Sequence, residues 1–546
     1  MAISGLHLSF VGIGMYKLLR RITGSYPVGG AFGILFLALY ILMIGFTVSA
    51  VRALTMFLFR VGADMAGRHY DAPTALSVAA VVVLLWRPLS LYDGGFWLSF
   101  GAVLAILAVV PVVQEGICTR TLHSNGQKMK MKTKVSVQEA LSVYVSRSTD
   151  VSYSGLVGVT GNRRGETQSS PRQNREDCFL STYLMGGWEH VRQVILQGLT
   201  ASVGINLVIL PILLYYFFEF PLYSFILNLF VIPLMSVLLF LGIAGSLFVL
   251  WCGPVSSLLF LVCGKILWIY QMSCKLTLHL PGARLVVGRP DVWQIVAYYG
   301  ILIIVLLLLR EKERLIEHVD MQKYAVSGSD VNMQKHMAGK SDAGIQKRAA
   351  RLGRFALMLG MIGIIILTNR WGERGKLTTV VLDVGQGDGI FMRGPKGGTY
   401  LVDGGSSDVK KAGQYRIEPF LKSQGVVVVD YVLISHGDSD HMNGVEELIE
   451  RQDIGVRIGT LVMPVQEVWD EALKGLAEKA LANGTHVAVI EPGQNIKEGN
   501  MSITCIQPGN PETEAGNGEA EGRDAEEGYE PGNAASMVLA VKFGEF

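Results

Sequence analysis

Long apolar segments recur through the first 370 residues and constrain the fold more than any other feature. A helix needs about 20 apolar residues to cross a bilayer. Half of all residues are hydrophobic and only 17% are charged. The sequence therefore predicts a chain that crosses a membrane several times. The segments lie at roughly 2–16, 31–50, 74–86, 97–113, 194–217, 222–250, 254–271, 293–309 and 355–369.

Two of these segments are ambiguous in length. Segment 74–86 is short for a span and can be a re-entrant helix, whereas 222–250 is long enough for one tilted helix or a broken pair. Residues 1–309 are predicted to form one membrane domain, and 355–371 its last transmembrane helix.

Two polar, basic regions interrupt the apolar pattern. Region 114–192 has few apolar positions and no periodicity, and we expect most of it to be flexible. Region 310–354 is predicted to be a basic linker. Because basic loops favour the cytoplasm, both regions are placed there, and the chain after residue 371 then lies outside the membrane. Lys17, Arg20 and Arg21, read as a loop, fit this topology poorly.

The pattern changes at residue 376 to short strands and glycine-rich turns, which predicts an α/β domain over 376–546. From residue 378 onward, 13 basic residues face 27 acidic ones, a net charge of −14, whereas the rest of the chain carries +16. An acidic domain is thus joined to a basic membrane domain. Expected strands are 380–384, 389–393, 399–402, 426–434 and 487–490, with helices at 443–451 and 465–483.

Four side chains that can bind a cation fall within six residues: His436, Asp438, Asp440 and His441. They follow the apolar strand 426–434 and are predicted to lie on a loop before a helix. Imidazole and carboxylate suit zinc, and carboxylates also suit harder ions such as manganese. Lone Asp or His residues in such a place usually cap the next helix, but four in this alternation predict a metal site.

This segment resembles the signature of the metallo-β-lactamase fold, His-x-His-x-Asp-His, with Asp438 in place of the second His. Residues 382–389 (LDVGQGDG) and 401–405 (LVDGG), which contain Asp388 and Asp403, make it similar to the C-terminal domain of the ComEC competence family. A structural turn role is the simpler interpretation of those glycines. Asp403, at a strand end, is expected to support the metal ligands, and Asp388 to lie in the turn.

The membrane part resembles the same family. Residues 3–7 (ISGLH) include His7, residues 86–100 resemble a Pro…Asp-x-Gly-Phe segment, and 211–233 resemble a later segment that contains Asn228. Ionisable and polar residues inside a membrane are costly and therefore candidates for function. Glu219, between aromatic residues and a proline, is expected at the water interface instead.

The resemblance implies a multi-span helical membrane domain followed by a metallo-β-lactamase-like αββα sandwich. It implies an inner-membrane channel for single-stranded DNA in natural transformation, whose hydrolase domain degrades the other strand. It implies a divalent metal, two ions of zinc or manganese, with Asp440 as catalytic residue. It also implies a bacterial plasma-membrane location with the hydrolase domain outside, membrane lipid, a homo-oligomer, a DNA receptor outside and an ATPase inside.

The chain departs from the family pattern after residues 533–539, where a Thr-Gly-Asp turn and a later His are expected; the only His after His441 is His486. We therefore expect a fragment whose hydrolase domain is incomplete. Two alternatives to a DNA channel with a nuclease stay open. One is a transporter whose hydrolase acts on another substrate, and the other is a hydrolase fold that serves only as a binding module.

Overall fold

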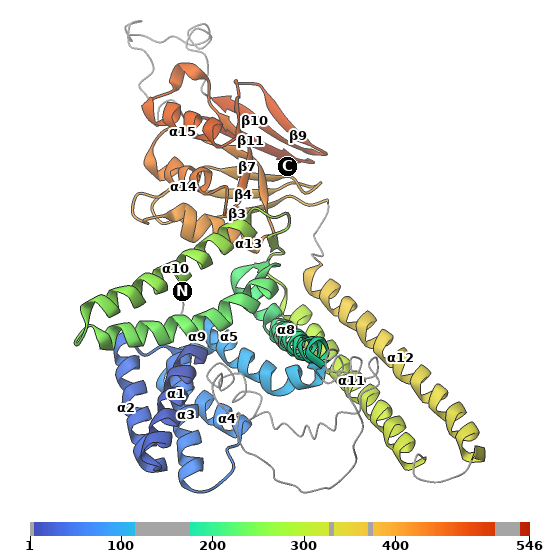
Figure 1. Cartoon of the computed structure of the whole chain (residues 1–546). Helices are drawn as coiled ribbons and strands as arrows, with labels where there is room; N and C mark the ends of the chain where they lie inside the picture. The colour runs from blue at the N-terminus through green and yellow to red at the C-terminus, as the bar shows by residue number, and fades with distance from the viewer. Residues whose placement is uncertain (1–4, 115–174, 327–331, 370–374, 508–535, 546) are drawn as a thin grey trace, which may run out of the picture. The chain divides into compact units, whose positions relative to one another are not determined.

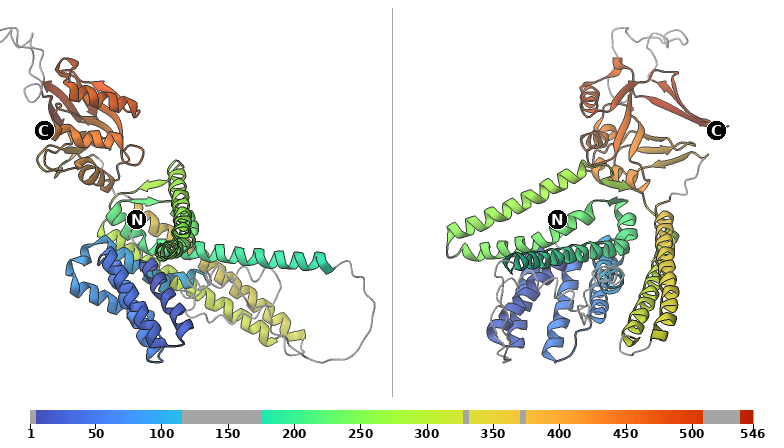
Figure 2. Two further views of the ribbon diagram at one scale, coloured as in Figure 1. Left: turned by 60° about the vertical axis from the view of Figure 1, so that its left-hand side comes forward. Right: turned by 45° about the vertical axis from the view of Figure 1, so that its right-hand side comes forward.

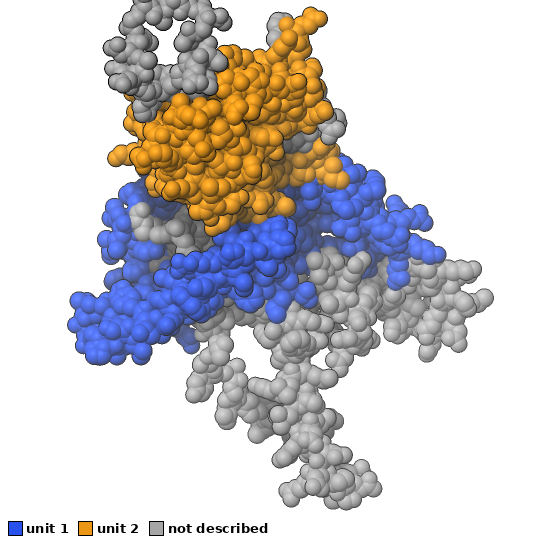
Figure 3. All heavy atoms as spheres, turned by 90° about the horizontal axis from the view of Figure 1, so that it is seen from above, with its two compact units in different colours: residues 1–212, 221–283, 296–364 blue, residues 213–220, 284–295, 365–546 orange. Residues whose placement is uncertain are grey.

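The computed structural model describes residues 5–114, 175–326, 332–369, 375–507 and 536–545. The chain divides into two compact units (Figure 3). One is helical and comprises Met1–Ile212, Pro221–Ala283 and Val296–Ile364; the other comprises Leu213–Phe220, Arg284–Ile295 and Ile365–Phe546.

The helical unit is built from helices, most of them long (Figure 1). Seven helices in the described part of the chain are long and apolar enough to cross a membrane. The predicted multi-span helical domain is therefore confirmed. The seven are α2 (Tyr26–Ile44), α5 (Gly94–Leu104, continued by a π turn at Ala105–Val109), α8 (Arg175–Phe217), α9 (Ser224–Phe248), α10 (Gly253–Leu278), α11 (Val292–Val326) and α12 (Asn332–Thr368). The described part of the unit also contains α1 (Gly5–Thr23), α3 (Val48–Met65) and α4 (Ala72–Trp86).

Sequence patterns alone misplace the second and third helices. The predicted segment 31–50 contains the end of α2, at Ile44, and the start of α3, at Val48. Helix α3 was missed because Arg52, Arg60 and Asp64 lower its apolar character. One face of it is nevertheless buried, and Arg52 donates from Nη1 to the carbonyl of Ser99 at 2.5 Å.

The basic residues near the start of the chain were also placed wrongly. Lys17, Arg20 and Arg21 lie in α1, which runs to Thr23, and not in a loop. Helix α8 begins at Arg175, inside the region predicted as a flexible insert; residues 115–174 of that insert lie outside the described residues. Segment 222–250 is one helix, α9.

Helices α11 and α12 run side by side (Figure 2) and extend well beyond the predicted spans 293–309 and 355–371. Gly363 of α12 permits close packing, because a Cβ there would lie 3.2 Å from the Ile301 side chain of α11. Most of the linker predicted at 310–354 therefore continues these two helices.

The second unit contains a six-stranded mixed sheet in the order β3-β4-β5-β6-β7-β8. Strands β3, β4 and β5 are antiparallel, and β5 to β8 are parallel. A three-stranded antiparallel sheet has the order β11-β10-β9. The strands are β3 (Thr378–Val381), β4 (Ile390–Arg393), β5 (Thr399–Val402), β6 (Val428–Leu433), β7 (Arg457–Met463), β8 (His486–Val489), β9 (Asn495–Glu498), β10 (Met501–Gln507) and β11 (Val538–Phe543).

Helices and the small sheet cover opposite faces of the six-stranded sheet (Figure 1). The helices are α13 (Glu418–Ser423), α14 (Ser439–Glu450) and α15 (Glu471–Ala482). One apolar core, which includes Val432 and Leu461, lies under the helices. A second core, which includes Leu433 and Val462, lies between the two sheets. Because neighbouring strand residues point to opposite faces, apolar strands such as β6 supply both cores. This helix–sheet–sheet layering confirms the predicted α/β class.

Glu219, for which we expected a place at the water interface, takes part in an ion-pair network of the second unit. It lies in β1 (Glu219–Pro221), which pairs with β2 (Arg284–Val286). Its Oε2 is 3.1 Å from Lys422 Nζ and 3.9 Å from an Arg284 guanidinium nitrogen. Lys422 also pairs with the buried Glu418 at 2.9 Å. The network fixes β1 and β2 against α13.

Candidate metal centre

Two parallel neighbouring strands, β5 and β6, end next to each other and position the candidate site. The backbone N–H of Asp403, just after β5, donates to the carbonyl of Leu433 at the end of β6. Asp403 is 5% exposed and has a φ of 54°, a left-handed conformation that Asp and Asn adopt more readily than most residues. The Asp403 carboxylate therefore faces the residues that follow β6.

Ser435 links Asp403 to both candidate histidines. The Ser435 backbone N–H donates to Asp403 Oδ1 and its hydroxyl donates to Oδ2, each at 2.7 Å. The hydroxyl oxygen also lies 2.9 Å from His436 Nδ1 and 3.4 Å from His441 Nδ1. Because the hydroxyl proton is directed at Asp403, the oxygen accepts from His436 Nδ1–H. This leaves the lone pair of His436 on Nε2.

His441 is held by the same carboxylate. Its Nδ1 lies 3.1 Å from Asp403 Oδ2. This hydrogen bond raises the pKa of His441 above its usual value, although burial opposes the shift. A carboxylate on one imidazole nitrogen fixes the ring and directs the other nitrogen toward a metal. The ring centroids of His436 and His441 are 4.0 Å apart.

The two acidic candidates stand beside these rings. Asp438 Oδ2 lies 3.3 Å from His436 Nε2, and Asp440 Oδ2 lies 3.9 Å from His441 Nε2. The expectation of a loop is only partly correct, since Asp440 and His441 occupy the first turn of α14 and Asp438 is its N-cap residue. Helical geometry thus sets the direction of the last two candidates.

Glycines let a neighbouring turn pack directly on this site. A Cβ on Gly387 would lie 2.4 Å from the carbonyl oxygen of Gly405 and 2.5 Å from that of Asp440. The N–H of Asp388 donates to the Asp440 carbonyl at 3.1 Å, and the Asp388 carbonyl accepts from Gly405 at the same distance. The turn therefore fixes the backbone at Asp440, and the largely exposed Asp388 side chain stays 3.8 Å from His441.

The donor set fits a divalent cation. His436 Nε2 is buried and has no hydrogen-bond partner among the described residues. Buried polar groups almost always have a partner, so this atom requires an explanation, and a bound ion provides one. In the described part of the chain no three such side chains converge on one point; they form two pairs, one at each imidazole. Two imidazole nitrogens and two carboxylates are ligand types that zinc and manganese accept.

The remaining sequence candidates lie elsewhere. His7 is in α1 and Asn228 in α9, both in the helical unit. His486 begins β8 and is exposed. Ser435, which connects Asp403 to both imidazoles, was not recognised from the sequence. A hydroxyl directly after an apolar strand and before a candidate ligand is the signal that could have identified it.

Comparisons with known proteins cover both units. The family model described as "Competence protein" matches residues 1–148 and 178–312. The model of the metallo-β-lactamase superfamily matches residues 382–538, which contain the candidate centre. This superfamily implies a divalent metal.

Individual relatives are distant. ComE operon protein 3 of Bacillus subtilis (strain 168) is 19% identical over 527 residues, which are 94% of this chain and 53% of that protein. Recombination protein 2 of Haemophilus influenzae is 32% identical over 114 residues, 19% of this chain and 14% of that protein. The chain thus spans about half the length of the Bacillus relative. Among solved structures, the diiron β-hydroxylase CmlA from Streptomyces venezuelae matches 36% of this chain and 32% of its own at 17% identity, with a TM-score of 0.18, too low to support an argument.

Proposed function

This chain belongs to the competence protein family, and on that premise we propose that it forms a plasma-membrane channel for single-stranded DNA in natural transformation. The chain is a multi-pass membrane protein with a metallo-β-lactamase domain. The finer proposal is that this domain hydrolyses the strand that is not transported. The observation that carries it is the pair of imidazoles oriented by Asp403 and Ser435, with His436 Nε2 buried, 3.3 Å from Asp438 Oδ2 and without a hydrogen bond in the described structure.

We place the hydrolase domain outside the cell, and the C-terminal end of α11 and the N-terminal end of α12 inside. The basic residues between 310 and 354 support this orientation, because basic segments favour the cytoplasm. Transport then requires partners that the chemistry of uptake implies: a DNA receptor outside, a motor ATPase inside, and further copies of this chain around the pore. His7 and Asn228 are proposed to act in the membrane domain.

In the hydrolase site, His436, Asp438, Asp440 and His441 would hold the metal, two ions in our proposal. When bound, the ions supply positive charge that stabilises developing negative charge on the phosphate oxygens. Asp403 and Ser435 hold both imidazoles at Nδ1 and keep their Nε2 atoms available. Asp388 is proposed to hold the backbone of Asp440 in place through the hydrogen bond from its own N–H.

Asp440 is the proposed catalytic residue. Its side chain is 36% exposed, so water reaches it, and the backbone at Asp440 is fixed by the hydrogen bond from Asp388. A carboxylate in this position accepts a proton from the water that attacks phosphorus. The first turn of α14 adds helix-terminal N–H dipoles, which favour an anionic substrate.

A second candidate function keeps the hydrolase but changes its substrate. The hydrolase domain carries a net charge of −14, whereas DNA binding usually depends on Lys and Arg contacts to phosphate. Eight of the acidic residues lie in the segment from Glu512 to Glu530, outside the described residues. A transporter that hydrolyses a lipid or cell-wall fragment would not need Lys and Arg contacts along a phosphate backbone.

The test uses the full chain purified in detergent. Metal content is measured by mass spectrometry, and cleavage of end-labelled DNA is followed with added Mn²⁺ or Zn²⁺. Asp440→Ala is the test variant, and Glu478→Gln, an exposed carboxylate on α15, is the matched control. We expect metal-dependent cleavage that Asp440→Ala abolishes and Glu478→Gln retains.

Other outcomes decide between the candidates. Bound metal without DNA cleavage moves the assignment to another substrate. Cleavage that persists in Asp440→Ala removes that residue from the mechanism. Failure of the purified wild-type chain to bind either ion contradicts the proposed centre.

A further inference from the structure

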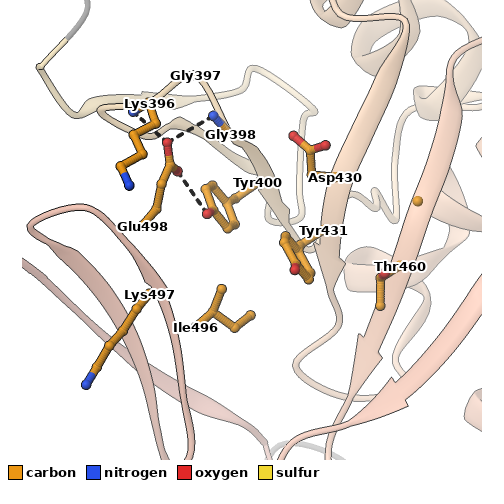
Figure 4. Close-up of a pocket in the computed structure, with 11 residues that line it drawn as sticks. Lys396, Gly397, Gly398, Tyr400, Asp430, Tyr431, Thr460, Ile496, Lys497 and Glu498 are labelled. Carbon is orange, nitrogen blue, oxygen red and sulfur yellow. Dashed lines mark hydrogen bonds between the residues drawn. The ribbon is translucent and has the colours of Figure 1, made fainter.

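A pocket of about 660 Å³ lies in the second unit, at the rim where the six-stranded sheet meets β9 (Figure 4). Its volume is within the range of roughly 300–1,000 Å³ that small-molecule sites occupy. It is lined from β5, β6, β7, β9 and the turn between β4 and β5. Nothing in the proposed hydrolysis uses it.

The floor of the pocket is an aromatic ladder. Tyr400 of β5 and Tyr431 of β6 are register partners, and their rings are stacked with centroids 5.6 Å apart and an interplanar angle of 8°. The next register partner of Tyr431 is Thr460 of β7. Figure 4 shows Tyr431 between Tyr400 and Thr460. Thr460 carries no ring and lines the pocket beside Tyr431, so the row of stacked rings ends at Tyr431.

The ladder is fixed at its other end. The buried Glu498 accepts hydrogen bonds from the N–H groups of Lys396 and Gly398 at 2.6 and 3.1 Å, and from the Tyr400 hydroxyl at 2.9 Å. Burial and this carboxylate raise the pKa of Tyr400, so its hydroxyl stays protonated and donates. The Tyr400 ring is therefore a rigid support for Tyr431.

The charges around the pocket differ in how far they are already paired. Glu498 accepts the three hydrogen bonds above, and Asp430 Oδ2 accepts two from Thr399 at 2.8 Å. The side chains of Lys396 and Lys497 flank the same rim and are exposed (Figure 4). Figure 4 shows both lysines on the Tyr400 and Glu498 side of the pocket, with Tyr431 and Thr460 on the other side.

We propose that this pocket binds one base of single-stranded DNA on the free face of Tyr431, with Lys396 and Lys497 contacting phosphates of the flanking nucleotides. The inference rests on the proposed function, since it supplies a cationic contact with DNA in a domain whose net charge is negative. Single-strand binding sites combine aromatic stacking platforms with cationic side chains in this way. A sugar ring can also stack on a tyrosine, but a neutral sugar has no phosphate for Lys396 and Lys497 to contact.

The pocket lies on the strands that also carry the metal centre. Tyr431 precedes Ser435 by four residues, or about 13 Å along an extended strand. A base held on Tyr431 would therefore anchor the strand a short distance from the hydrolytic site. The pocket would act as a positioning subsite and not as part of the reacting centre.

The test separates stacking from cleavage. The full chain carrying Asp440→Ala, treated with chelator, is titrated with fluorescein-labelled (dT)₁₀ and followed by anisotropy. Thr460→Phe places a protein ring beside Tyr431, and Tyr431→Leu removes the platform. Thr460→Val is the matched control, because it keeps the size of Thr460 and adds no ring. We expect Kd to rise about fivefold or more in the first two variants and to stay within twofold in the control.

Two further readouts locate the contact. A (dT)₁₀ carrying one 5-iododeoxyuridine is expected to photo-crosslink to Tyr431. Lys497→Gln is expected to reduce the dependence of log Kd on log salt by about 0.7, the value for one single-strand phosphate contact. Lys474→Gln, an exposed lysine of α15, should leave that dependence unchanged.

Unchanged Kd in both Thr460→Phe and Tyr431→Leu, with crosslinks elsewhere, overturns the inference. Displacement of (dT)₁₀ by an N-acetylglucosamine oligomer assigns the pocket to a glycan and also overturns it. These outcomes are independent of the hydrolase test. If DNA is cleaved in a metal-dependent way and the pocket variants leave Kd unchanged, the proposed hydrolase function stands and the pocket inference fails. If the pocket variants weaken oligonucleotide binding and no cleavage is found, the pocket inference stands and the hydrolase function fails.

Discussion

Replacing Asp403 by Asn tests how the candidate centre is held together. The side-chain shape is retained, and Asn also tolerates the left-handed backbone at φ 54°. The amide oxygen can still accept from the Ser435 N–H. The amide nitrogen then occupies the place of Oδ2, where it meets the Ser435 hydroxyl and His441 Nδ1. A carboxylate that accepts hydrogen bonds is thereby replaced by a donor.

The size of the effect follows from these contacts. Loss of a carboxylate that orients a ligating histidine typically lowers metal affinity 10- to 100-fold. The buried, mismatched hydrogen bonds cost about 1–3 kcal/mol of the free energy of unfolding. Asp403→Ala removes every acceptor at once and places Ala in a left-handed conformation, which costs about another 1–2 kcal/mol. The alanine variant is therefore expected to be less stable than the asparagine variant.

The assay measures zinc affinity by competition with a chromophoric chelator, and stability by thermal unfolding, on the full chain in detergent. Asp453→Asn, at an exposed position, is the matched control and should change neither quantity. Wild-type zinc affinity in Asp403→Asn would refute the argument that Asp403 orients His441. Equal stability of the Asn and Ala variants would refute the argument from backbone conformation.

Three further perturbations test other contacts. Removal of the metal by a chelator should lower the unfolding temperature of the wild-type chain, because an ion at 100 times its Kd stabilises the folded state by about 2.7 kcal/mol. Asp440→Ala should show no such shift, because it lacks one of the proposed metal ligands. An equal shift in both proteins contradicts a role for Asp440 in metal binding. Gly387→Ala should lower the free energy of unfolding by about 1–3 kcal/mol and weaken metal binding, because its Cβ would meet the Gly405 and Asp440 carbonyls. The control Gly475→Ala, whose Cβ lies in open space on α15, should leave the free energy of unfolding unchanged or raise it. Lys422→Met should lower the free energy of unfolding by about 3 kcal/mol, because it leaves the buried Glu418 with one fewer cation. The control Lys474→Met, at an exposed position, should change the free energy of unfolding by no more than about 0.5 kcal/mol.

Sequence patterns located those elements that carry a strong apolar signal. The runs at 389–393, 399–402 and 426–434 coincide with β4, β5 and β6, because each is continuous and bounded by turn residues. Strand β7 was missed, since Arg457 and Gly459 interrupt its pattern. Helix α3 was missed for a related reason. Its charged residues interrupt the apolar pattern, although one face of the helix, which carries Arg52, is buried.

The four ligand candidates were predictable because they are close in the sequence, whereas Asp403 was expected to support them only because it follows a strand. His436, Asp438, Asp440 and His441 fall in one short segment, and their spacing alone points to a cation. Ser435 and Asp403 are 32 positions apart and meet only through the pairing of β5 with β6. A single sequence carries no direct signal for that pairing.

The same pairing connects the metal centre to the aromatic pocket. Tyr400 pairs with Tyr431, and Val402 with Leu433, so Asp403 and Ser435 leave the two strands together. In a strand, a slip of one residue turns every side chain to the opposite face. A slip between β5 and β6 would therefore separate the stacked tyrosines and withdraw the Asp403 carboxylate from both imidazoles at once. The register of these two strands is thus a single determinant of both sites, and a variant that disturbs it should lose metal affinity and oligonucleotide binding together.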